Sequence, residues 1–422
     1  MDGSPFDGPD GRQRTVIALA AVARFAAAIL MGTGLAVIVE RLGGSPFAVS
    51  MVLGAYFGGM MLFAPFWGAV ADATGRRRDV LLWTSALATL TVPLLVVAEG
   101  VWAPIGLRGL YAVFAAGFSP VMLSFASARG GDDDRGSEMG FFNSARGAGI
   151  TVGQVGAGVL LGLATPDTFY LVVAGVSAVS VLAVALVTDP ADVDGTTDPK
   201  TVVSEVRRRL FPPPDEREHF DRGGLRWLYV ALVARNTTVL GVISLLPTYF
   251  AGPVGASTAV MGLLLALNPA GQTVCMYVFG KAADAYGRKP LITAGIAGSG
   301  AFAVLAAAAS LPTAEGVRVV VAGLAMVLIA ASFSAMNTGA VAFIGDVAPP
   351  EHESGLMGLR TTAKGLGGLL GPVLVGSLAT ATSYRTAFLL GSSLAFGAAV
   401  LASVRLVETN PAAGGTAFAA DD

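Results

Sequence analysis

The sequence predicts an all-α integral membrane protein with twelve transmembrane helices in two pseudo-symmetric bundles of six. Three observations support this prediction. The chain is 54% hydrophobic and 13% charged, whereas soluble domains carry about 25% charged residues. Several uncharged apolar stretches reach the ~20 residues that a spanning helix needs. A short motif rich in glycine and basic residues also occurs twice, between apolar stretches in each half of the chain.

The expected spans follow in order from the apolar stretches. Five uncharged stretches each provide one span, at 80–98, 168–188, 291–314, 319–345 and 386–404. The uncharged stretch 236–280 is too long for one span, and the segment AGPVGAST, which begins at Ala251, divides it into two. The helices lack the polar faces of a soluble bundle. Counted in this way, the spans centre near residues 28, 58, 89, 116, 151, 178, 238, 268, 301, 331, 367 and 395.

The distribution of basic residues predicts the orientation in the membrane. With the N-terminus inside, the inner segments carry 18 Lys and Arg residues, and the outer loops carry only Arg41 and Arg385. The positive-inside rule therefore places both termini in the cytoplasm, and we expect a multi-pass protein of the plasma membrane. Met1 to Arg14 is polar, so we expect no cleaved signal. The single cysteine, Cys275, lies in a span and permits no intramolecular disulfide.

A polar linker divides the chain into two groups of six spans. Residues 189–226 carry nine acids and seven bases, with three prolines at 212–214. This segment is either a disordered tether or contains a short amphipathic helix near 202–210. The expected organisation is a cytoplasmic tail at 1–14, a bundle at 15–188, the linker at 189–226, a second bundle at 227–407 and a tail at 408–422.

Three blocks repeat in the same order in the two halves. GAVADATGRRRDV at 68–80 matches GKAADAYGRKPLI at 280–292, and VAR at 22–24 matches VAR at 233–235. Residues 139–158 share one basic and six other positions with 357–376, at an offset of 218. Parallel repeats of six spans are typical of secondary transporters, and they predict a substrate cavity between the halves near the bilayer midplane.

Residues 68–77 resemble the signature loop of the major facilitator superfamily, Gly-x-Leu-Ala-Asp-Arg-x-Gly-Arg-Lys, and 280–289 resemble its second copy. The resemblance covers residues 15–407 and implies that fold and a transport function. Ala73 and Ala285 stand where the family often has Arg. The resemblance also implies that Asp72 and Arg76 form a latch between the halves. The alternative is that these charges only set the topology.

The resemblance implies a set of gating residues around both loops. Asp346 looks like the acidic partner of Arg288 in the second half. Ala128 stands at the aligned position of the first half, so a partner there must come from Asp132 to Asp134. The candidate gating residues are Gly68, Asp72, Gly75, Arg76, Gly280, Asp284, Gly287, Arg288 and Asp346.

Two further patterns bear on ion coupling. Arg108 begins RGLYAVFAAGFSP, which is similar to the family's helix-4 pattern, and in proton-linked members that Arg is implicated in proton coupling. A snorkelling Arg near the outer boundary is the alternative. The glycines at 149–158 and 367–376 form a degenerate copy of the family's antiporter motif, with Gln154 in place of the first Pro. Ordinary packing of small residues explains most of that pattern.

Seven basic residues fall within the spans, and no acid lies deep in any of them. Four of the seven lie at one depth, about 12–15 Å from the cytoplasmic boundary at 1.5 Å per residue. A cation at that depth is costly unless it meets water, a carbonyl or an anion, and Arg holds carboxylate or phosphate through two parallel hydrogen bonds. These residues bind an anionic substrate or, alternatively, snorkel to the inner surface. The candidate binding residues are Arg24, Arg146, Arg235 and Lys364, together with the neutral Tyr56, Asn268, Gln272 and Asn337.

These features predict a secondary active transporter that works by alternating access and carries an organic or phosphate-type anion. An ion-coupled efflux antiporter for drug-like solutes and a non-transporting membrane sensor remain alternatives. An enzyme is not expected, because the two histidines, His219 and His352, lie in loops and no catalytic or Walker motif occurs. We expect no cofactor and no metal. The expected partners are the substrate, the bilayer and a coupling proton or exchanged anion, with no nucleic acid, and we expect a monomer.

Overall fold

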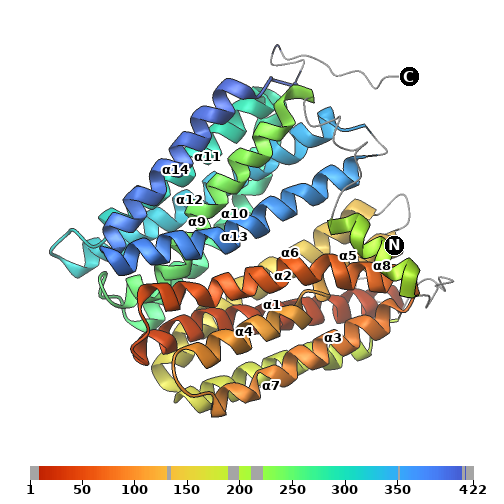
Figure 1. The fold of residues 1–422 in the computed structure, drawn as a ribbon, viewed down its shortest axis with the longest axis horizontal. Coiled ribbons are helices and arrows are strands. Elements are labelled where there is room, and N and C mark those ends of the chain that lie inside the picture. Colours follow the sequence, from red (N-terminus) through yellow and green to blue (C-terminus); the bar gives the residue numbers. More distant parts are fainter. Residues whose placement is uncertain are drawn as a thin grey trace, which may run out of the picture. The chain divides into compact units, whose positions relative to one another are not determined.

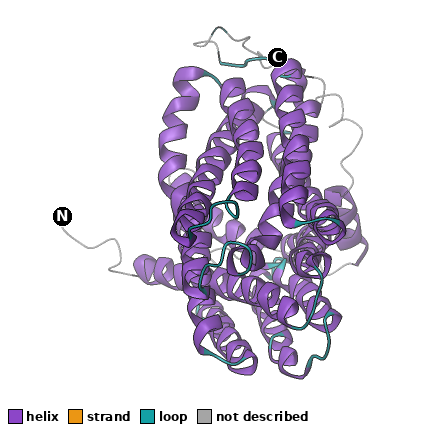
Figure 2. Ribbon diagram, turned by 90° about the vertical axis from the view of Figure 1, so that its left-hand side faces the viewer, coloured by secondary structure: helices purple, strands orange, loops and turns teal. Residues whose placement is uncertain are grey.

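The structure is a computed structural model that describes residues 9–130, 135–188, 199–210, 222–349, 352–410 and 414. These residues form helices joined by short loops, and none of them lies in a strand (Figure 2). The all-α class predicted from the sequence is therefore confirmed. The acidic residues 132–134 and most of the linker fall outside the described residues.

The chain divides into two compact units. The first consists of Met1–Ile38 and Gly58–Phe211, and the second of Val39–Phe57 and Pro212–Asp422. Figure 1 shows the helices of each unit in the colours of the sequence. The first unit shares α2 (Pro46–Thr74) with the second. Its other helices are α1 (Pro9–Arg41), α3 (Arg77–Thr91), η1 (Pro93–Val97), α4 (Trp102–Ala115), α5 (Phe118–Gly130), α6 (Arg135–Leu163), α7 (Pro166–Ala185) and α8 (Pro199–Leu210). The second contains α9 (Leu225–Ala251), α10 (Thr258–Tyr286), α11 (Arg288–Ala308), α12 (Glu315–Val347), α13 (Glu353–Ala381) and α14 (Tyr384–Arg405).

The helices reproduce the twelve predicted spans. In the described part of the chain, eleven helical segments are long and apolar enough to cross a membrane. The twelfth predicted span is α6, which is 29 residues long but carries charged residues. Two spans are interrupted: α3 continues into the 3-10 helix η1, and α4 and α5 meet at a break before Phe118. The helix α8 agrees with the alternative in which the linker contains a short helix near 202–210.

Local sequence signals fix several helix ends. Thr165, Ser257 and Ser383 each accept a hydrogen bond from the backbone N–H three residues later, which caps α7, α10 and α14. Pro166 occupies the first turn of α7, where its missing N–H costs nothing. The predicted division of the long uncharged stretch is also confirmed, because α9 ends at Ala251.

Each unit has its own apolar core and an apolar outer surface. Phe118, Phe125 and Phe142 are almost fully buried in the first unit, as are Ile296 and Phe343 in the second. Large apolar side chains elsewhere remain exposed on long helices, including Trp83, Leu163 and Val400. Large apolar side chains exposed on membrane-length helices suit contact with lipid rather than water.

Glycines allow equivalent helices to pack closely in the two units. A Cβ atom at Gly153 of α6 would lie 2.8 Å from the carbonyl oxygen of Ala26 in α1. A Cβ atom at Gly371 of α13 would lie 2.4 Å from the carbonyl oxygen of Thr237 in α9. These glycines therefore bring two backbones together, which is the role of small residues in membrane helices. The packing alternative explains the glycine pattern at both places.

Candidate functional site

Arg24 lies in the core of the first unit. Arg24 is 3% exposed, and its Nη1 atom donates a hydrogen bond of 2.8 Å to the hydroxyl oxygen of Tyr111 in α4. Its Cζ atom also lies 4.8 Å from the centre of the Tyr111 ring and 5.8 Å from that of Phe118. The other terminal nitrogen, Nη2, is buried without a hydrogen-bond partner. Part of this guanidinium thus keeps its capacity to donate.

Arg235 occupies the equivalent position in the second unit and has an equivalent environment. It is 2% exposed, and its Nε atom donates to the hydroxyl oxygen of Ser299 in α11 at 2.9 Å. Its Nη1 atom donates to Oδ1 of Asn236 at 3.0 Å, and its Cζ atom lies 5.4 Å from the ring centre of Phe333. Its Nη2 atom is also buried without a hydrogen-bond partner.

The two buried arginines share a chemical property that matters for binding. Neither of them makes an ion pair within the described part of the chain. Hydroxyl, amide and aromatic partners stabilise a guanidinium but leave its positive charge uncompensated. A buried charge without a counter-charge is unfavourable, so each site favours the approach of an anion.

The other predicted cations differ from this pair. Arg146 of α6 lies with its Cζ atom 5.3 Å from the ring centre of Phe25 in α1, and Lys364 is half-buried on α13. Arg108 is 2% exposed, and its Nη2 atom donates to the carbonyl oxygen of Ala28 in α1 at 2.9 Å. Arg108 therefore points into the bundle, and the snorkelling alternative does not describe it. The predicted ring of four cations spans both units and stays a prediction.

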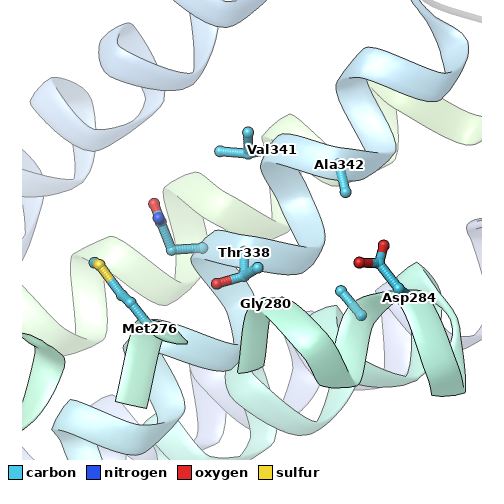
Figure 3. Close-up of a pocket in the computed structure, with 8 residues that line it drawn as sticks. Met276, Gly280, Asp284, Thr338, Val341 and Ala342 are labelled. Atoms are coloured by element: carbon cyan, nitrogen blue, oxygen red, sulfur yellow. The ribbon is translucent and has the colours of Figure 1, made fainter. Parts of the chain in front are cut away.

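The neutral polar candidates of the second unit lie on α10 and α12. Gln272 donates to Oδ1 of Asn268 at 2.8 Å, as their spacing of one turn predicts. Asn337 of α12 accepts a hydrogen bond from Nη1 of Arg360 in α13. A pocket of about 310 Å³, which Asn337 helps to line, opens between α10 and α12 (Figure 3). It is lined by Met276, Gly280, Ala283, Asp284, Asn337, Thr338, Val341 and Ala342.

The remaining binding candidate, Tyr56, is half-buried on α2, and its ring packs edge-on against Phe57 at 5.8 Å. The structure also brings in residues that the sequence did not single out as partners. Tyr111 and Ser299 hold the two buried arginines, and Arg360 holds Asn337. No sequence signal identifies such partners, because depth along a helix does not say which way a side chain turns.

The two signature-like loops carry different charge networks. In the first loop, Oδ1 of Asp72 lies 3.6 Å from Nε of Arg77. Arg76 is exposed at the start of α3, after Gly75, whose φ is +66°. Gly68 is buried within α2, well before this turn.

In the second loop, Arg288 is the centre of the network. Its Nη1 atom lies 3.4 Å from Oδ1 of Asp284, and its Nε atom lies 3.0 Å from Oδ2 of Asp346. Gly287 precedes it with φ of +97°, and Gly280 lies two turns earlier in α10 with open space beside it. The acid expected near Arg288 is thus in direct contact with it.

Comparisons with known proteins agree with this architecture. The family model for the Major Facilitator Superfamily matches residues 16–257 and, separately, 227–421. No curated protein sequence matches the chain. Among solved structures, the nucleoside transporter NupG has a TM-score of 0.75 at 13% identity, with 93% of this chain and 98% of that chain covered.

Two other solved structures show the same fold. A bacterial homolog to the human lysosomal transporter Spinster, in an inward-facing and occupied conformation, has a TM-score of 0.74 at 13% identity, with 96% and 97% covered. A POT family transporter in complex with 5-aminolevulinic acid has a TM-score of 0.76 at 11% identity, with 96% and 98% covered. At such identities these structures indicate a shared fold and leave the substrate open.

Proposed function

Because the chain belongs to the major facilitator superfamily, we propose that it is a secondary active transporter that moves a small organic or phosphate-type anion across the plasma membrane by alternating access. At the coarser level the chain is a multi-pass membrane transporter and not an enzyme. The anion, the plasma membrane and the cytoplasmic location of both termini belong to the proposal. The excess of basic residues in the segments expected to face inward supports that orientation.

The observation that supports an anionic substrate is the pair Arg24 and Arg235. Both are almost fully buried, both stand in the repeated VAR block, and each has one terminal nitrogen without a hydrogen-bond partner. Retaining a buried guanidinium costs several kcal/mol unless it is used. Its retention at equivalent positions of both repeats favours a shared task.

The chemistry of guanidinium suits this task. A carboxylate or phosphate that approached Nη2 would complete the hydrogen bonds of the group and neutralise its charge at the same time. The partners already present, Tyr111 and Ser299, hold each guanidinium in one orientation. A fixed donor loses less conformational entropy on binding than a mobile one. The amides of Asn268, Gln272 and Asn337 are neutral groups available to orient the rest of a polar solute.

Two features bear on the direction of transport and on the coupled ion: the two glycine-rich segments and Arg108. The glycines at 149–158 and 367–376 serve close helix packing, so they do not favour antiport over other modes. Arg108 is a buried cation in contact with α1, which makes it a candidate for coupling a proton or an exchanged anion to movement of that helix. We therefore propose transport of an anion without assigning its direction.

A binding screen followed by a flux assay tests the proposed function. The melting temperature of detergent-purified protein is measured with phosphate, sulfate, small carboxylates and sugar phosphates, and in parallel with lipophilic cations such as tetraphenylphosphonium. We expect stabilisation by members of the anion set only, as ligand linkage requires. The best ligand is then tested for counterflow in proteoliposomes.

Each other outcome points to one of the alternatives. Stabilisation by lipophilic cations alone would replace the anion proposal with a drug-like efflux antiporter. Tight binding of an anion without counterflow, in a preparation that is monodisperse and reconstituted in both orientations, would indicate a sensor.

A further inference from the structure

The residues that follow α14 fold back onto the loop between α10 and α11. Leu406, Thr409 and Asn410 are buried, at 2%, 3% and 6% exposed. The backbone N–H of Val407 donates to the carbonyl oxygen of Gly223, just before α9, at 3.0 Å. We call residues 406–410 the strap.

Glu408 of the strap caps the N-terminus of α11. Its Oε1 atom accepts a hydrogen bond from the backbone N–H of Arg288 at 2.9 Å, and its Oε2 atom accepts one from the N–H of Lys289 at 3.0 Å. The first N–H groups of a helix have no partner within the helix, and a carboxylate there is also favoured by the helix dipole. A cap normally precedes its helix directly, whereas this one comes from 120 residues further along the chain.

The next two strap residues bind Asp346 and Asp284, the two acidic residues that contact Arg288. Thr409 donates through Oγ1 to Oδ2 of Asp346 at 2.7 Å, the same oxygen that receives Nε of Arg288 at 3.0 Å. Asn410 donates through Nδ2 to the carbonyl oxygen of Asp284 at 2.9 Å. The strap thus binds the backbone of Arg288 through Glu408, the carboxylate of Asp346 through Thr409 and the backbone of Asp284 through Asn410. These groups surround the Arg288 guanidinium.

The glycine of the second loop is adapted to the strap. Gly287 has φ of +97°, a conformation that disfavours any side chain. A Cβ atom at this position would in addition lie 2.7 Å from Oε2 and 2.8 Å from Cδ of Glu408. A side chain at position 287 is therefore disfavoured for a second reason, because the Glu408 carboxylate occupies the space that it would need.

The first loop is fastened in a different way. Arg76, at the start of α3, makes no side-chain capping hydrogen bond. Instead, Nη2 of Arg78 donates to the carbonyl oxygen of Ala185 at the end of α7, at 2.6 Å. Each loop is tied to the last helix of its own repeat, but the second uses a carboxylate on helix N–H groups where the first uses a cation on a helix carbonyl.

We propose that the strap is a positioning device for the second signature-like loop. Glu408 fixes the backbone of Arg288, which keeps its guanidinium between Asp284 and Asp346, and release of the strap allows the α10–α11 loop to move. This inference goes beyond the proposed function, since it does not depend on which solute is carried.

The test measures whether the loop opens locally when the strap is broken. A cysteine is introduced at Ala283, which is 2% exposed in α10 about one turn before Gly287, in a Cys275→Ser background. The rate of its modification by a hydrophilic maleimide is compared in the parent and in Glu408→Ala and Glu408→Gln. A second reporter at Ala322, which is 0% exposed in α12, registers unfolding of the whole unit. Glu315→Ala is the matched control, because it removes an exposed acid from the first turn of another helix.

Release of the strap has a defined signature in this assay. Glu408→Ala should speed modification at position 283 by about three- to thirtyfold, the range expected for loss of a helix cap. The rate at position 322 and the Glu315→Ala control should not change, and Glu408→Gln should be intermediate. An unchanged rate at 283, or equal increases at 283 and 322, would overturn the proposal.

A double-mutant cycle with Gly287 keeps the proposal testable if the reporter variants fold poorly. A methyl group at position 287 displaces the Glu408 carboxylate, so Gly287→Ala should reproduce most of the loss in melting temperature seen in Glu408→Ala. When the two changes are combined, their effects should be clearly less than additive, because both remove the same contact. Simple additivity would show that Gly287 and Glu408 act independently and would overturn the proposal.

Discussion

The Nη1 atom of Arg24 lies 2.8 Å from the hydroxyl oxygen of Tyr111, and the Cζ atom of the same arginine lies 4.8 Å from the centre of the Tyr111 ring. One tyrosine therefore serves the cation twice, through its hydroxyl and through its π face. The two contacts are separable by mutation, because phenylalanine keeps the ring and removes only the hydroxyl.

Tyr111→Phe should destabilise the protein by about 1–3 kcal/mol, the cost of leaving a buried donor unsatisfied. The Nη1 atom would join Nη2 as a second nitrogen of Arg24 without a partner. Chemical or thermal unfolding in detergent measures the change, and Tyr277→Phe is the control because Tyr277 is 69% exposed. Equal stability of the two variants would mean that the hydroxyl contributes nothing to holding Arg24.

At Arg24 and at Arg235, both loss of the charge and replacement by lysine should lower the affinity for the anion. Glutamine at either position should weaken anion binding by about 1.5–3 kcal/mol, the scale of a hydrogen bond to a charged group. Lysine should recover only part of this, because it cannot reproduce the planar fork. Affinity is measured at matched protein levels, and full affinity in both lysine variants would remove these residues from the binding site.

Asp72→Asn should slow transport and leave membrane insertion and substrate binding largely intact. Asp72 stands in the first loop and lies 3.6 Å from Arg77, so the change removes a charge from the loop without altering its shape. Asp284→Asn is the matched variant in the second loop. Uptake rates and equilibrium binding are measured in the same preparations, and a normal rate for Asp72→Asn would rule out its proposed role in gating.

Gly371→Ala should destabilise the second unit by about 1–3 kcal/mol, the usual cost of overpacking. The added methyl group would lie 2.4 Å from the carbonyl oxygen of Thr237, which belongs to a helix backbone and cannot move aside easily. Gly358→Ala in the same helix is the control, since nothing lies within 4 Å of its Cβ position and the change improves helix propensity. If both variants melt alike, close approach of α9 and α13 does not depend on Gly371.

The sequence predicted the helices and the repeat because both leave a periodic or compositional trace. Apolar length identified the spans, and the break at Ala251 followed from one glycine- and proline-containing segment. The depth of Arg24 and Arg235 along their helices was also accessible. Their neighbours were not, because the rotation of a helix about its axis depends on packing partners that no local pattern encodes.

The strap shows most clearly what could not be predicted. Residues 408–422 were expected to form a tail, since polar residues after the last span carry no sign of a docking site. The contact between Glu408 and Arg288 joins residues 120 positions apart and depends on where α14 ends relative to α11. The family resemblance offered Asp346 as the partner of Arg288, and it gave no reason to expect the second ion pair with Asp284 or an acid that binds backbone rather than side chain.

The close approach of Gly153 to Ala26, and of Gly371 to Thr237, also bears on how the two halves have diverged since an ancestral duplication. Ala26 and Thr237 are 211 positions apart, whereas Gly153 and Gly371 are 218 apart, so seven residues have been gained or lost between the paired segments. The same backbone-to-backbone contact nevertheless exists in both repeats. The change in chain length therefore lies in the segments between the contacting helices and has left the contacts themselves in place. In an alignment of related chains, insertions should accumulate between these segments and avoid the segments themselves.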